Sequence, residues 1–224
     1  MAEGKPQDQY EVHPALARFT TAIENFAEYI SRHWAGMINL LLLAYVAMPF
    51  LAPVFMQVGW TFPARAIYTI YTPACHQLPE RSYFLFGESA VYDEHELQAN
   101  GVELSDNPLL RRRYIGDEAH GWKVAICQRD VAIYGAMFLT GLIFALANFR
   151  FPQLSWKLFL LFLVPMAIDG GLQLIGLHSS NWLLRTITGV IFGVGTIWLI
   201  YPYLANSMKN VVKPGDTTES KIED

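Results

Sequence analysis

The sequence predicts an all-α integral membrane protein, a four-transmembrane-helix bundle with a small extracytoplasmic cap between the first and second helices. Two observations predict this class. Of the 224 residues, 53% are hydrophobic and only 16% are charged, whereas soluble proteins carry about a quarter charged residues. In addition, four segments stay apolar over the roughly 18 or more residues that a helix needs to cross the hydrocarbon core.

The four membrane helices follow from runs with few or no charged side chains. The first two runs contain none, the third contains Lys157 near its start and Asp169 inside, and the fourth contains Arg185 near its start. The predicted membrane domain therefore covers residues 35–204. Its helices are expected at residues 35–59, 131–148, 154–176 and 182–204.

The two ends of the chain, residues 1–11 and 206–224, are polar. Residues 1–34 form a predicted cytoplasmic N-terminal segment, whose first residues lack the basic stretch and apolar core of a cleaved signal peptide. Residues 205–224 contain Pro214 and Gly215 followed by hydroxyl and acidic residues. We expect this cytoplasmic tail to be disordered, because little in it is apolar enough to pack.

Lysine and arginine in short flanks indicate the orientation, since cytoplasmic loops are enriched in both. The connection 177–181 between the third and fourth helices has neither. We therefore expect a multi-pass protein of the cell membrane with both termini in the cytoplasm. The basic residues on the predicted cytoplasmic side are Arg18, Arg32, Arg150, Lys157, Lys209 and Lys213.

The long segment between the first two helices, residues 60–130, is called the cap. It is too long for a bare loop, so we expect it to carry structure of its own on the outer face. Residues 62–71 are aromatic and apolar, as in an interfacial helix. Residues 93–98 and 108–114 are candidate short helices, the second preceded by Asp106 or Asn107 as its cap.

This topology gathers polar side chains at the outer end of the bundle. The second helix begins there, the third ends there, and the fourth begins there, so their polar ends share one level with the cap. The residues of this candidate polar cluster are Cys75, His76, Gln77, Arg81, Cys127, Arg129, Asp130, Asp169, Gln173 and Arg185.

Asp169 lies about two turns below the outer end of its helix, at a depth where an unpaired charge is costly. Arg185 is its predicted partner, because the short turn between the third and fourth helices makes them antiparallel neighbours. Such a pair either pins two helices together or belongs to a polar pocket open to the outer face. The convergence of several polar groups favours the pocket.

Cys75 and Cys127 are the only cysteines. In an oxidising compartment two such residues usually pair, and a disulfide between them is our leading prediction. Two alternatives remain open. One is a metal site formed by both cysteines with His76 and His120, although no C-x-x-C spacing supports it and we assign no metal. The other is a free Cys75 nucleophile close to His76.

Gly189 and Gly193 form a small-xxx-small pattern in the fourth helix, which allows a second backbone to approach closely. Because such patterns are common by chance, we expect ordinary packing inside the bundle rather than a dimer interface.

With these residues in view, the sequence resembles a family of uncharacterised prokaryotic multi-pass membrane proteins, a domain of unknown function. In many of its members a C-x-R-C motif stands where this chain has Cys127-Gln128-Arg129-Asp130, and the departure at Asp130 weakens a multi-cysteine metal site. The resemblance implies no activity. It is carried by Cys75–Gln77 (CHQ) with Arg81–Ser82 (RS), Tyr114–Asp117 (YIGD) with Gly121–Ala125 (GWKVA), Cys127–Tyr134 (CQRDVAIY), and Asp169–Gly170 (DG) with Arg185–Gly189 (RTITG).

Two functions remain in competition. The first is an accessory or binding subunit with a polar site at the outer membrane face, in contact with the lipid bilayer and with other membrane subunits as possible partners. The second is a membrane-embedded enzyme acting there on a polar or lipid-linked substrate, although the chain lacks any complete catalytic motif. No cofactor is indicated, and no basic run is long enough to suggest nucleic acid.

Overall fold

The computed structural model describes residues 14–148, 150–177 and 180–212 of the chain. Within these ranges helices predominate, and four of them are long and apolar enough to cross a membrane, as the sequence predicts. These helices are α1 (Pro14–Gln57), α5 (Gln128–Leu146), α6 (Trp156–Leu174) and α7 (Trp182–Val212). The chain divides into two units, residues 35–203 and the two flanking segments 1–34 and 204–224.

The first and last helices extend beyond their apolar runs. α1 begins at Pro14, a residue suited to the first helical turn, and its residues 14–34 carry exposed apolar side chains at helical spacing, including Leu16, Phe19, Ile23 and Phe26. α7 continues to Val212, so the prediction that disorder starts at residue 205 is wrong for residues 205–212. The remaining tail lies outside the described residues.

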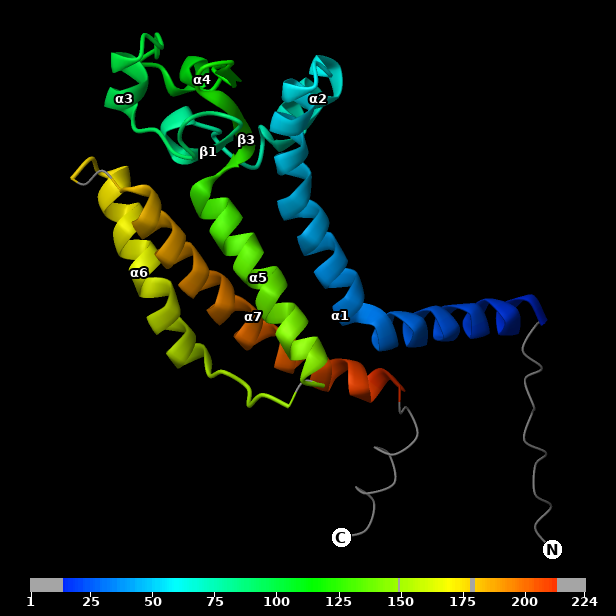
Figure 1. Cartoon of the computed structure of the whole chain (residues 1–224). Coiled ribbons are helices and arrows are strands. Elements are labelled where there is room, and N and C mark those ends of the chain that lie inside the picture. The colour runs from blue at the N-terminus through cyan, green and yellow to red at the C-terminus, as the bar shows by residue number, and fades with distance from the viewer. Residues whose placement is uncertain (1–13, 149, 178–179, 213–224) are drawn as a thin grey trace, which may run out of the picture. The chain divides into compact units, whose positions relative to one another are not determined.

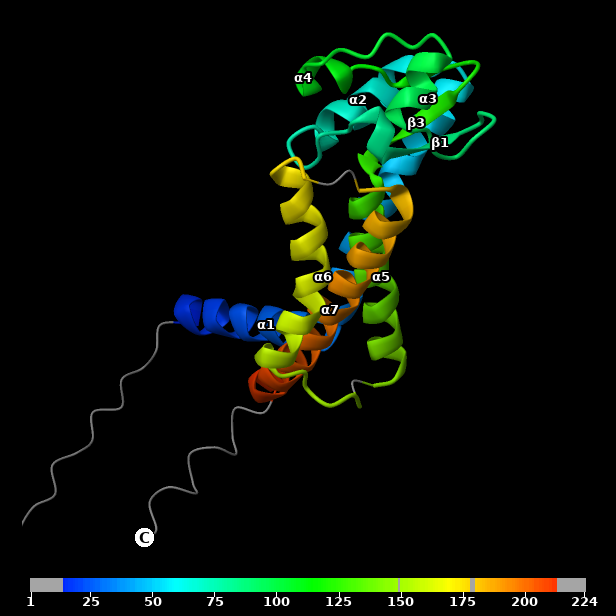
Figure 2. The ribbon, with the colours of Figure 1, turned by 90° about the vertical axis from the view of Figure 1, so that its left-hand side faces the viewer.

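Within residues 35–203, α5 and α7 pack closely through small residues. A β-carbon added to Gly193 would lie 2.5 Å from the Ile133 carbonyl oxygen, and one added to Gly189 would lie 2.9 Å from the Ala132 β-carbon. The predicted ordinary packing of this glycine pattern is therefore confirmed. Figure 2 shows α6 alongside α7 in the same bundle, and a β-carbon added to Gly195 would meet the Phe162 ring.

The cap contains a small antiparallel sheet that the sequence analysis did not anticipate. Its strand order is β1 (Ser82–Leu85), β3 (Gly121–Cys127), β2 (Gly116–Asp117). The register pairs Ser82 with Cys127 and Phe84 with Lys123, with a bulge between them. Because β3 runs directly into α5, the sheet is joined to the bundle without a loop, and the cap lies at one end of the helices (Figure 1).

Four short helices complete the cap, three of them near their predicted positions. They are α2 (Thr61–Tyr71), the 3-10 helix η1 (Pro79–Arg81), α3 (Glu94–Ala99) and α4 (Pro108–Arg111). Asp93 caps α3 by accepting from the Glu96 N–H at 2.7 Å, and Asn107 caps α4 by accepting from the Leu109 N–H at 2.9 Å. The side-chain oxygens thus satisfy donors that a helix start leaves unpaired.

The core of the cap lies between α1, α2 and β3. Ala52 and Met56 of α1 meet Ala64, Ile67, Tyr68 and Tyr71 of α2 and the buried stretch Val124–Ile126 of β3. The Tyr68 hydroxyl donates to the Lys123 carbonyl oxygen at 2.5 Å, which fixes α2 against the strand. This core holds Cys75, the first residue of the site, in a buried position just after α2.

Candidate functional site

The polar residues meet in a cavity of about 490 Å³ between the cap and the end of the bundle, which we call the junction pocket. Its walls come from the segment after α2, the start of α4, the first turn of α5, the last turns of α6 and the first turn of α7. Asp169 is the one predicted residue that does not line it. The predicted residues in its wall are Cys75, His76, Gln77, Arg81, Cys127, Arg129, Asp130, Gln173 and Arg185.

Asp169 is almost fully buried in α6 and forms an ion pair with Arg129 of α5. The predicted pairing with Arg185 is therefore wrong. Depth along a helix follows from counting residues, but the partner depends on which face of α6 the carboxylate occupies. Among the described residues, Arg129 Nε and the second carboxylate oxygen, Asp169 Oδ1, remain buried without a hydrogen-bond partner.

Arg185 instead connects α7 to the cap. Its guanidinium donates to the Glu80 carbonyl oxygen at 3.2 Å, to Gln128 Oε1 at 3.1 Å, and to the carbonyl oxygen of Ser180. Gln128 in turn donates to the Ser82 carbonyl oxygen at 3.0 Å. This buried network fixes η1, the start of α5 and the start of α7 around the pocket.

The two cysteines are free thiols with their sulfur atoms 3.7 Å apart. A disulfide requires about 2.05 Å between the sulfurs, so the predicted bridge is absent from this structure. The Cys127 thiol donates to Asp130 Oδ2 at 3.2 Å. Hydrogen bonding with Cys75, together with burial, raises the pKa of the Cys127 thiol well above its ordinary value.

Backbone N–H groups point at the sulfur of Cys75. The Cys127 N–H donates to Cys75 Sγ at 3.2 Å, and the Gln77 N–H donates to it at 3.5 Å. Gln77 has a φ of 53°, a left-handed conformation that costs a non-glycine residue about 1 kcal/mol or more. Its side chain compensates by donating to the Tyr68 carbonyl oxygen at 2.8 Å.

The histidines considered for a metal site separate in the structure. His76 is exposed and lines the junction pocket next to Cys75. His120 belongs to another cluster, where its Nδ1 lies 2.9 Å from Asp117 Oδ1 and its ring meets Tyr92 edge to face. The alternative of a site containing both cysteines and His120 is therefore not supported.

Lys123 was not among the predicted site residues. Its side chain is fully buried beneath the pocket wall, and its Nζ donates to the carbonyl oxygens of Gln77 at 2.6 Å and Arg112 at 2.7 Å. Burial lowers its pKa to about 7. A lone lysine within an apolar stretch is the sequence signal that marks it.

Four apolar helices joined to a folded cap define a multi-pass membrane protein. The chain belongs to the predicted membrane protein family DUF2085. The family model matches residues 118–199, and an uncharacterised protein of Methanocaldococcus jannaschii is 32% identical over 170 residues, which cover 72% of this chain and 85% of the relative. No solved structure matches. The predicted family resemblance is confirmed, and the matched region includes Cys127, Asp169 and Arg185.

Proposed function

We propose that the protein is an accessory or binding subunit whose junction pocket, at the outer membrane face, holds the phosphate-bearing headgroup of an anionic lipid or lipid-linked compound. One observation carries the proposal: Arg81, Arg129 and Arg185 line a single pocket, against one acidic lining residue, Asp130. Arginine is the side chain best suited to phosphate, because its planar fork donates two hydrogen bonds at once.

Two further features support an anionic ligand. Arg129 Nε and Arg185 Nε are buried without a hydrogen-bond partner within the described part of the chain. A buried unpaired donor costs about 1–3 kcal/mol, which an acceptor on a ligand would recover. The cavity of about 490 Å³ also falls in the size range of small-molecule sites, and residues near the ends of α5, α6 and α7 line it.

The test compares a pocket arginine with a matched arginine elsewhere in the cap. Arg81 is half-buried in the pocket wall, whereas Arg113 is exposed and does not line the pocket. We expect short-chain phosphatidylglycerol to raise the melting temperature of the detergent-purified protein more than phosphatidylcholine does. Arg81→Gln should weaken this binding about 10- to 100-fold, the value of a charge-assisted hydrogen bond, while Arg113→Gln should leave it unchanged.

Inorganic phosphate and glycerol phosphate separate the possible sources of the anion. A response to the lipid alone identifies a lipid headgroup, and an equal response to the soluble phosphates identifies a soluble ligand. Equal losses in Arg81→Gln and Arg113→Gln would indicate surface electrostatics and would contradict a pocket ligand.

The second candidate, a membrane-embedded enzyme, is favoured by Cys75. Its buried sulfur lies in the pocket wall beside His76, where two backbone N–H groups hold it in a fixed position, as a nucleophile requires. An enzyme would convert its retained lipid over time in the wild-type protein but not in Cys75→Ser. A binding subunit would release the same compound unchanged from both proteins, as mass spectrometry of the extracted lipids would detect.

A further inference from the structure

We propose that Cys75, Cys127 and Asp130 form a binding site for a thiophilic divalent cation, with Zn²⁺ as the type ion, in the wall of the junction pocket. The inference does not depend on the phosphate ligand, because the metal site uses a different set of side chains. It rests on the positions of three ligand atoms, on the elements that hold them and on the charge around them.

The ligand atoms have the spacing of a tetrahedral site. The two sulfurs and a carboxylate oxygen of Asp130 all lie within 4.8 Å of one another. With a Zn–S bond of about 2.3 Å, two sulfurs of a tetrahedron lie about 3.8 Å apart. The sulfurs of Cys75 and Cys127 are 3.7 Å apart, so an ion can be placed between them without moving either backbone.

The carboxylate fits with a small adjustment. For Zn–S and Zn–O bonds of about 2.3 and 2.0 Å, a sulfur and an oxygen on one tetrahedron lie about 3.5 Å apart. Cys127 Sγ and Asp130 Oδ2 are 3.2 Å apart and share a hydrogen bond. An ion would replace the thiol proton of Cys127, and the two atoms would separate by a few tenths of an ångström.

Rigid elements hold each ligand in place. Cys75 follows α2, and its N–H donates to the Tyr71 carbonyl oxygen at 3.0 Å. Cys127 ends the central strand β3, and Asp130 stands in the first turn of α5, three residues later. Two backbone N–H groups also fix the position of Cys75 Sγ by hydrogen bonds.

The ligand chemistry and the surrounding charge select the ion. Two thiolates suit zinc and similar soft ions, whereas Mg²⁺ and Ca²⁺ require mainly oxygen ligands. Two thiolates, one carboxylate and a divalent cation together carry one negative charge, which the arginines of the same pocket offset. Three protein ligands leave the fourth position open toward the pocket, as in zinc sites that bind a further ligand.

The test loads the full-length protein, purified in detergent and fully reduced, with Co²⁺ alone as the probe. We expect one Co²⁺ per chain, with a thiolate-to-cobalt charge-transfer band that Zn²⁺ abolishes by displacement. Loss of a partner that only hydrogen-bonds to a metal ligand typically weakens metal binding about 10- to 100-fold. Asp130→Asn removes a direct ligand and should weaken Co²⁺ binding by more than this. Asp130→Cys should instead bind more tightly and strengthen the band, because it adds a third thiolate.

If replacement of Cys75 or Cys127 prevents folding, Asp130→Cys still tests the site. This variant keeps both cysteines and is expected to strengthen the charge-transfer band. His95→Ala, which changes an exposed histidine on α3, is the control for surface binding and should behave as wild type. Three results would overturn the site: Co²⁺ binding that survives in the Cys75→Ser/Cys127→Ser variant, no binding by the reduced wild-type protein, or an unchanged band in Asp130→Cys. None of them bears on the lipid assay, which uses metal-free protein.

Discussion

Lys123 shows how one side chain organises the wall of the junction pocket. Its amine reaches two backbone carbonyls, one in the Gln77 turn beside Cys75 and one at Arg112, just past α4. A neutral amine has two N–H donors, one for each of these acceptors, and burial lowers its pKa to about 7. The lysine therefore ties two segments of the cap to the central strand β3.

Lys123 also predicts a pH dependence of stability. A lysine in the unfolded chain titrates near about 10.4, whereas the folded protein holds the pKa of Lys123 at about 7. Between these values the unfolded chain binds one proton more, so the free energy of unfolding rises with pH across this window. Relative to Lys123→Met, the wild-type protein should gain on the order of a few kcal/mol between about pH 7 and pH 10.

Thermal unfolding of both proteins in the same detergent, at a series of pH values, measures this difference. Groups other than Lys123 titrate in both proteins and cancel in the comparison. The difference in the free energy of unfolding between wild type and Lys123→Met should not change with pH below about 7, where Lys123 is protonated in both the folded and the unfolded protein. A difference that stays flat from about pH 7 to pH 10 would mean that Lys123 remains charged in the folded protein.

The depth of the charged residues could be predicted from the sequence, but their partners could not. Asp169 and Arg185 both lie near the cap end of the bundle, as counting along their helices predicts. Their helices are neighbours in the chain, which made a pair between them the simplest expectation. The carboxylate instead faces Arg129 of α5, while Arg185 turns to the cap. Orientation about a helix axis depends on packing that residue spacing does not specify.

The close contact between helices α5 and α7 holds the first turn of α5 in place. This turn carries Arg129 and Asp130 and directly follows Cys127. Added β-carbons at Gly189 and Gly193 would collide with α5, whereas one at Gly135 of α5 would have no atom within 4 Å. Small residues let the helix backbones approach, and dispersion between them stabilises the pair in lipid, where no hydrophobic effect assists.

Gly193→Ala and Gly135→Ala therefore form a matched pair with opposite expected effects. The first should lower the free energy of unfolding by about 1–3 kcal/mol through overpacking. The second should raise it by up to about 1 kcal/mol, because alanine is the better helix former. Thermal unfolding of the two variants in one detergent provides the measurement. Equal effects would show that α7 does not approach α5 closely at Gly193.

Helices were easier to predict than strands. The long apolar runs indicated all four membrane helices, but a search for such runs misses the start of α1, where charged and apolar residues alternate at helical spacing from Pro14 onward. β3 was missed because most of its residues are buried, so it lacks the alternation that marks a half-buried strand. Its partner β1 is four residues long and distant in sequence, and such non-local pairing leaves no local pattern.

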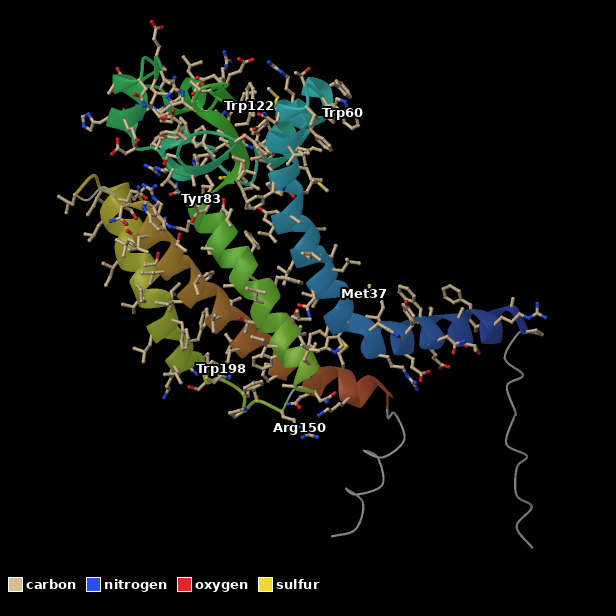
Figure 3. All side chains as sticks on the ribbon, in the orientation of Figure 1. Met37, Trp60, Tyr83, Trp122, Arg150 and Trp198 are labelled. Carbon is tan, nitrogen blue, oxygen red and sulfur yellow. The ribbon has the colours of Figure 1, made fainter. Side chains whose placement is uncertain are left out.

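At the scale of the whole unit 35–203, the polar chemistry lies at one end. Trp60 and Trp122 mark the cap end, and Trp198 and Arg150 mark the other (Figure 3). At that other end, the Trp198 ring N–H donates to the Pro152 carbonyl oxygen at 2.9 Å. Tryptophan is enriched at both membrane interfaces, and this distribution fits a bundle whose helices are long enough to cross a membrane.

The last prediction concerns which side of the membrane the cap faces. Arg150 and Lys157 flank the connection between α5 and α6, whereas the short connection 175–181 at the cap end carries no lysine or arginine. The positive-inside rule therefore predicts that the cap and the junction pocket lie outside the cytoplasm. A reporter active only outside the cytoplasm should work when inserted at Gly101, an exposed turn after α3 with a φ of 84°.

The same reporter should fail at Gln153, an exposed position in the α5–α6 connection, and after Asp224. Both fusions serve as controls, because they test the opposite side at an internal and at a terminal site. The orientation also bears on the thiols: outside the cytoplasm two free sulfurs 3.7 Å apart are exposed to oxidation, and a bound cation would protect them. Activity at Gln153 without activity at Gly101 would reverse the topology and place the junction pocket, with its cysteines, in the reducing cytoplasm.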